Sequence, residues 1–73
     1  MKKFEITIGS LPNKDNLVAD IFYDRFQVAE ITNENNEFLI QLFFYENKDC
    51  WTFLLEDFQK VIEDAKRRLI EVG

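Results

Sequence analysis

The segment from Phe38 to Tyr45 constrains this chain most, because it has the pattern of a β-strand that is apolar on both faces. Successive side chains of a strand point to opposite sides of its sheet. One face carries Phe38, Ile40, Leu42 and Phe44, and the other carries Leu39, Phe43 and Tyr45, with Gln41 as the polar member. The 73 residues make one small domain, spanning 1–73, with a single convincing helix pattern. Since one helix covers one face, sheet curvature, a second copy or a different protein must close the other face.

The rest of the chain predicts the elements around this strand. Alternating apolar and polar residues favour β-strands. The expected strands are 4–8, 17–23, 26–32, 38–45 and 50–54. The turn at 33–37 is the clearest, because asparagine tolerates a positive φ. From Glu56 the apolar period lengthens to about 3.6 residues, which predicts a helix. We therefore expect an α+β fold, an antiparallel β-meander of about five strands with one C-terminal helix packed on one face.

The net charge of −5 is unevenly distributed along the sequence. Residues 15–57 contain ten acids, and their only basic residues are Arg25 and Lys48. An acidic field repels nucleic acid and attracts basic proteins, although acids also keep a small protein soluble. The basic residues at 66–68 are expected in the last helical turn, and Glu56 and Asp57 in the first, where both complement the helix dipole. We therefore expect no nucleic-acid binding.

The residues that most enzymes use for acid–base or metal chemistry are missing from this sequence. It contains no histidine and one cysteine, Cys50, so histidine-dependent triads and ordinary zinc patterns are excluded. Cys50 is expected to be a small buried hydrophobe. Paired carboxylates would need a pocket that a domain of this size has little material to build. We expect a protein that is not an enzyme and that holds no metal and no cofactor.

The sequence also indicates where the protein works. It shows neither the long apolar stretch of a membrane span nor the pattern of a signal peptide. A lone cysteine cannot form an intramolecular disulfide, which fits a reducing compartment. We expect a cytoplasmic protein that does not bind membranes.

Three segments carry a resemblance to known proteins. They are 11–21 (Leu-Pro-Asn-Lys-Asp-Asn-Leu-Val-Ala-Asp-Ile), 28–31 (Val-Ala-Glu-Ile) and 51–53 (Trp-Thr-Phe), followed by the amphipathic helix. This pattern resembles small bacterial immunity proteins of polymorphic and contact-dependent toxin systems. The resemblance implies a cytoplasmic inhibitor that neutralises a toxin domain, often a nuclease, by presenting acids to a basic cleft. It assigns no role to any single residue.

Three interpretations follow from these observations. The first is a non-enzymatic inhibitor of the immunity type, which acids steer onto a basic protein and aromatic side chains anchor there. Its expected interface residues are Asp20, Asp24, Glu30, Glu34, Glu37, Glu46, Phe22, Phe43 and Tyr45. The second is a homodimeric structural or regulatory module in which two copies bury their second sheet faces together. The third is a module with a curled, self-contained core whose function leaves no trace in the sequence.

Overall fold

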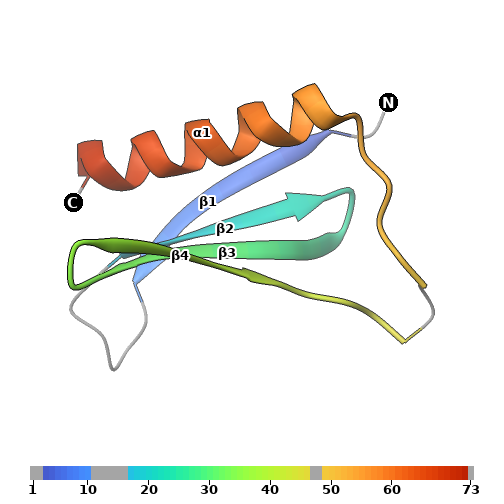
Figure 1. Cartoon of the computed structure of the whole chain (residues 1–73), viewed down its shortest axis with the longest axis horizontal. Helices are drawn as coiled ribbons and strands as arrows, with labels where there is room; N and C mark the ends of the chain where they lie inside the picture. Colours follow the sequence, from blue (N-terminus) through green and yellow to red (C-terminus); the bar gives the residue numbers. More distant parts are fainter. Residues whose placement is uncertain (1–2, 11–16, 47–48, 73) are drawn as a thin grey trace.

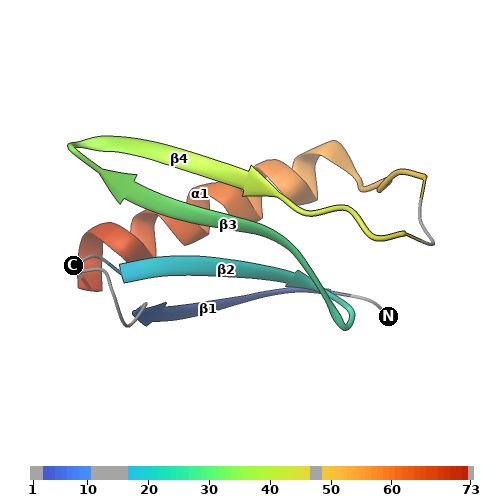
Figure 2. The same cartoon turned by 90° about the horizontal axis from the view of Figure 1, so that it is seen from below.

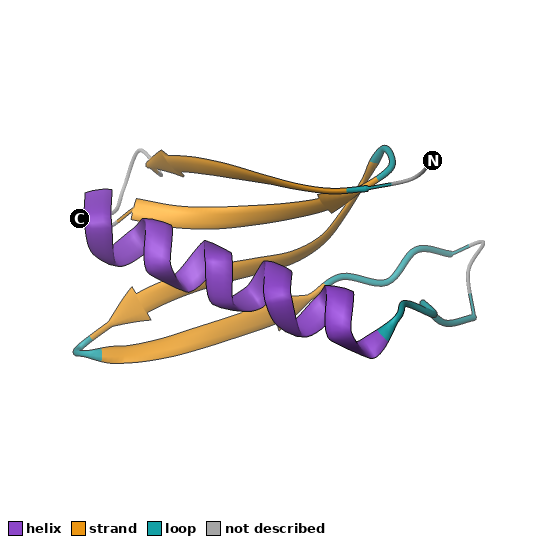
Figure 3. Cartoon of the chain, turned by 90° about the horizontal axis from the view of Figure 1, so that it is seen from above, coloured by secondary structure: helices purple, strands orange, loops and turns teal. Residues whose placement is uncertain are grey.

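Four of the expected strands form, and a helix follows them (Figure 1). The computed structural model describes residues 3–10, 17–46 and 49–72. Its elements are β1 (Phe4–Ser10), β2 (Leu17–Tyr23), β3 (Phe26–Glu34), β4 (Glu37–Leu42) and α1 (Leu55–Val72). The sheet order is β1-β2-β3-β4, every neighbouring pair is antiparallel, and α1 lies across one face (Figure 3). The predicted α+β meander with a C-terminal helix is therefore confirmed, with four strands in place of five. The loop expected at 11–16 lies outside the described residues.

The predicted fifth strand at 50–54 is wrong, although its alternation has a physical cause. This segment is extended but pairs with no strand among the described residues, because it crosses from the sheet to the start of α1. Its alternation places Trp51 and Phe53 inside, with their rings stacked at 5.8 Å, and leaves Cys50, Thr52 and Leu54 exposed. The expectation that Cys50 is buried is therefore also wrong.

Two tight turns connect β2 to β3 and β3 to β4. In the first, Tyr23 pairs with Phe26 across a two-residue turn in which Asp24 has a φ of 60°. In the second, Asn35 and Asn36 have φ values of 52° and 66°. Asparagine reaches this left-handed region more readily than most residues with side chains. The turn predicted at 33–37 forms, but it is limited to Asn35 and Asn36, because Asn33 and Glu34 belong to β3 and Glu37 to β4. This two-residue turn fixes the register in which β4 pairs with β3.

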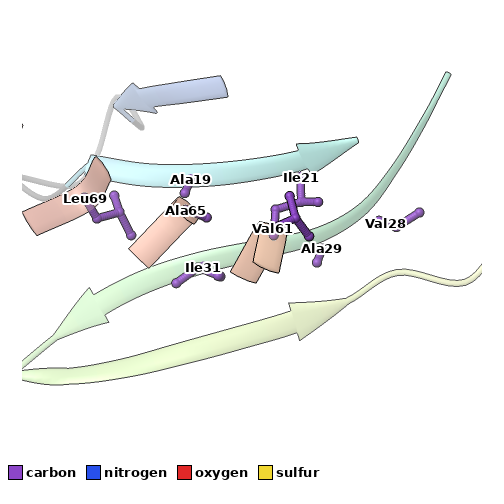
Figure 4. Packing of buried hydrophobic residues seen from close by; sticks show 8 residues of the cluster. All are labelled: Ala19, Ile21, Val28, Ala29, Ile31, Val61, Ala65 and Leu69. Carbon is purple, nitrogen blue, oxygen red and sulfur yellow. The ribbon is translucent and has the colours of Figure 1, made fainter. Parts of the chain in front are cut away.

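The aliphatic core lies between α1 and the middle of the sheet (Figure 4). Its buried members are Ala19, Ile21, Val28, Ala29, Ile31, Val61, Ala65 and Leu69. The three alanines bring helix and sheet backbones close together, and Ile21 fills the space beside them with no exposed surface. The pairing of β2 with β3 shifts between Ile21 and Phe22, and this irregularity lets Val28 join the core beside Ala29.

A second part of the core is aromatic and lies near the start of α1. It contains Phe4, Tyr23, Phe26, Tyr45, Trp51, Phe53 and Phe58, which are linked by ring contacts with centroid distances of 4.7 to 6.5 Å. The Trp51 indole donates a hydrogen bond of 3.1 Å to the Phe43 carbonyl, and the Tyr45 hydroxyl donates one of 2.8 Å to the Gln27 carbonyl. These bonds attach the segment after β4 to the sheet. Most of the aromatic side chains are therefore part of the core.

The charged residues at the two ends of α1 agree only in part with the prediction from sequence. Glu56 and Asp57 occupy the first turn as predicted. The basic residues at 66–68 do not occupy the last turn, because the helix continues to Val72. Arg67 instead contacts acids on its own helix, Asp64 at 3.0 Å and Glu71 at 3.8 Å. Among the described residues, no helix is both long and apolar enough to cross a membrane.

Candidate functional site

The face of the sheet opposite α1 collects every acidic side chain of the strands. Alternation places Phe4 and Ile6 toward the core, so Glu5 points to the other face, and the strand register assigns the remaining acids in the same way. The resulting acidic face consists of Glu5, Asp20, Glu30, Glu34 and Glu37. The four strands contain no lysine and no arginine. The described strands therefore place charges of one sign on this face.

Two pairs of acids face each other across neighbouring strands. Asp20 pairs in register with Glu30, and Glu34 pairs with Glu37. Like charges in directly opposite positions destabilise a sheet. Burial raises the pKa of Asp20, and a hydrogen bond of 2.8 Å that Gln27 Nε2 donates to Asp20 Oδ1 partly offsets this effect. A cation placed over Asp20 and Glu30 would relieve the repulsion between these two like charges.

The structure brings four of the six predicted acids together. Asp20, Glu30, Glu34 and Glu37 belong to the acidic face. Asp24 lies in the turn between β2 and β3, and Glu46 lies beyond β4, both at the opposite end of the sheet from the turn at 35–36 (Figure 2).

The sequence-based list missed Glu5, the fifth acid of this face. The alternation of β1 shows that the Glu5 side chain points away from the core. The distance of Glu5 from the other acids depends on the pairing of β1 with β2, in which Glu5 lies opposite Phe22. That pairing follows from the meander topology rather than from the alternation of one strand.

The three predicted aromatic anchors lie in different places. Phe22 is on the acidic face, half-buried, and pairs in register with Glu5 and Gln27. Tyr45 is part of the aromatic core, and its hydroxyl donates a hydrogen bond to the Gln27 carbonyl. Phe43 follows β4, and its amide donates to the Val28 carbonyl at 3.0 Å. Leu39 lies on the acidic face and is 47% exposed, so it is a further apolar contact point beside the acids.

The surface of the described residues also has two open grooves. A groove of about 340 Å³ beside the aromatic core is lined by Val28, Leu42, Phe43, Phe44, Cys50, Trp51, Phe53, Leu55 and Phe58. A wider groove of about 1170 Å³ lies between β1 and α1 and mixes basic residues such as Lys60 with acids such as Asp64. Over the described ranges, no group of three or more acidic or cysteine side chains is placed to hold a metal ion.

Comparison with known proteins gives this chain no relatives. No family model, no curated protein and no solved structure matches it. The resemblance to immunity proteins therefore stays a prediction, and the functional interpretation depends on the acidic face.

Proposed function

We propose that this protein is a non-enzymatic, immunity-type inhibitor that binds a basic protein domain through its acidic face. The observation that supports this proposal is the combination of five acids with no basic residue on the strands. A toxin domain that cleaves nucleic acid has a basic surface, because it must bind phosphates. An acidic sheet face presents the opposite charge to such a surface.

The arrangement of the acids favours fast association. Charges of one sign collected on one side of a small protein steer an oppositely charged partner toward that side. Phe22 and Leu39 add two separate apolar contact points on the same face, on β2 and β4. The opposed acids Asp20 and Glu30 add a further gain, since a basic partner reduces the repulsion between them.

The acidic face argues against the alternative of a homodimer that buries its second sheet face. Packing two copies through this face would bring ten carboxylates together with no basic strand residue between them. Burying unpaired charge is costly. A partner of opposite charge is therefore the better occupant for this side of the sheet.

The test compares capture by matched variants. Tagged wild-type protein, the face variant Glu30→Gln/Glu37→Gln and the helix variant Glu63→Gln/Glu71→Gln are incubated at low salt with lysate of the source cell. Both variants lose two negative charges, but the helix residues are exposed on α1, away from the acidic face. We expect the wild type and the helix variant to retain a basic protein in stoichiometric amount, and the face variant to lose it.

Inhibition is then measured directly on the captured partner. After release at high salt, the activity of the partner is assayed with and without added wild-type chain, nucleic-acid cleavage being the first activity to test. Inhibition by the wild type at equimolar concentration supports the proposal. Equal capture by all three proteins, or a partner that stays fully active when bound, contradicts it.

A further inference from the structure

Strand β4 is an edge strand, and its outer side is open. It pairs with β3 alone in the described sheet, and all of its residues are exposed (Figure 2). The helix α1 lies over β1, β2 and β3 and does not cover β4. From the helix, Lys66 reaches toward this strand, with its ammonium group 5.1 Å from the centre of the Phe38 ring. The row Phe38, Ile40 and Leu42 therefore stays 37%, 45% and 53% exposed on the side of the sheet that α1 occupies.

Most of this edge lacks the features that keep natural edge strands from pairing. Such strands usually carry a charge, a proline or a bulge that blocks a further strand. β4 carries one charge, Glu37 at its start, and the rest of the strand, residues 38–42, contains neither a charged residue nor a proline. The irregularity in the sheet lies between β2 and β3, away from β4. The other edge strand, β1, also has one acid near its start, Glu5.

We propose that β4 pairs antiparallel with β4 of a second copy of this chain, about a two-fold axis at Ile40. This register places Ile40 opposite Ile40 of the second copy, and Phe38 opposite Leu42. The apolar row of one copy then meets the same row of the other, with facing Cβ atoms about 5 Å apart. Two four-stranded sheets become one continuous sheet, and both copies of α1 lie on the same side of it.

Charge opposes a second copy less at this edge than on the acidic face. Each chain carries −5, so two copies avoid meeting through their acidic faces. At the β4 edge the first acid is Glu37, which this register places at opposite ends of the pair. The two Glu37 residues are six strand positions apart, about 20 Å at roughly 3.4 Å per residue. That separation is more than the Debye length of about 8 Å at physiological ionic strength.

The dimer and the proposed inhibitor function use different surfaces. Edge pairing leaves the acidic face of each copy open, so the assembly presents two such faces on the side of the sheet that carries no helix. The two interactions also respond to salt in opposite directions. Salt weakens binding between an acidic face and a basic partner, and it strengthens association of two copies that share one sign of charge.

Sedimentation equilibrium of the purified chain tests the proposal at 50 mM and 500 mM NaCl. We expect a reversible monomer–dimer equilibrium whose dissociation constant falls at the higher salt. The variant Ile40→Lys places two lysines opposite each other at the axis, and we expect it to raise the dissociation constant about tenfold or more. The control Thr7→Lys makes the same charge change at an exposed position on β1, and we expect it to leave the equilibrium unchanged.

Folding of each variant is checked by far-UV circular dichroism and by the fluorescence of the single tryptophan, Trp51. If Ile40→Lys does not fold, Leu39→Lys tests the same edge from the other side of β4. A chain that stays monomeric at 100 µM at both salt concentrations overturns the proposal. So does a dimer that persists in the β4 variants or that disappears in Thr7→Lys.

Discussion

Neutralising Asp20 should stabilise this protein and weaken its binding to a basic partner. Asp20 lies opposite Glu30, and the Cβ atoms of such a pair are about 5 Å apart. Two carboxylates separated by the same distance repel by about 0.8 kcal/mol in water, and burial adds to the cost of ionising Asp20. In Asp20→Asn the side-chain oxygen still accepts the hydrogen bond from Gln27, so the charge is the main loss. We expect a gain of about 0.8 kcal/mol, which for a domain of this size raises Tm by about 3 to 6 °C.

Thermal unfolding at pH 7, followed by Trp51 fluorescence, measures this gain. The matched control is Glu5→Gln, which removes an acid from the same face but lies opposite Phe22 rather than another acid. We expect the control to change Tm by less than half as much. A lower Tm for Asp20→Asn, or an equal gain in both variants, would refute the assignment of the repulsion to the Asp20–Glu30 pair.

The same variant has a defined pH dependence. Burial raises the pKa of Asp20, so the folded state holds this proton more tightly than the unfolded state does. The ionised carboxylate therefore costs stability at any pH above its folded pKa, and this cost disappears as pH falls through that pKa toward the unfolded value. The advantage of Asp20→Asn over the wild type should be complete at neutral pH and should vanish in acid. An advantage that grows as pH falls would contradict this sign.

Three further predictions concern the core, the turn and the thiol. Ile21→Ala opens a cavity beneath α1 and should cost about 2 to 5 kcal/mol, measured by urea unfolding; a loss below 1 kcal/mol would mean that Ile21 is not central to packing. Asn36→Ala should cost about 1 kcal/mol because φ is 66°, whereas Asn36→Gly should be close to neutral, and equal effects would exclude strain at this position. Cys50 should react with one equivalent of a thiol reagent in the native state, and protection until unfolding would contradict its exposure.

Local chemistry explains why most of the fold could be predicted from sequence. The helix has a sustained apolar stripe, and the two asparagines at 35–36 fit the positive φ that their turn requires. Segment 50–54 could not be assigned in the same way. Its apolar residues alternate because Trp51 and Phe53 contact the aromatic core. Any extended segment with one buried side shows this alternation, whether or not a neighbouring strand pairs with it.

The candidate site was less predictable, because it depends on strand register. The charge block indicated acidity, but the gathering of Asp20, Glu30 and Glu37 on one face depends on pairings between strands. The same limit applies to Tyr45, which alternation alone placed on the face away from the helix. The chain leaves the sheet after Leu42, and Tyr45 then joins the aromatic core.

The position of α1 after all four strands has a consequence for synthesis on the ribosome. The hairpins from β2 to β4 have two-residue turns and can form as soon as residues 17–42 are available. Their apolar face, which includes Ile21 and Ile31, has no cover until Leu69 is made. During that interval the nascent sheet presents both a bare apolar surface and the open edge of β4. Until α1 docks, this apolar face and the β4 edge are therefore the surfaces of the folding chain most prone to association with other chains or with chaperones.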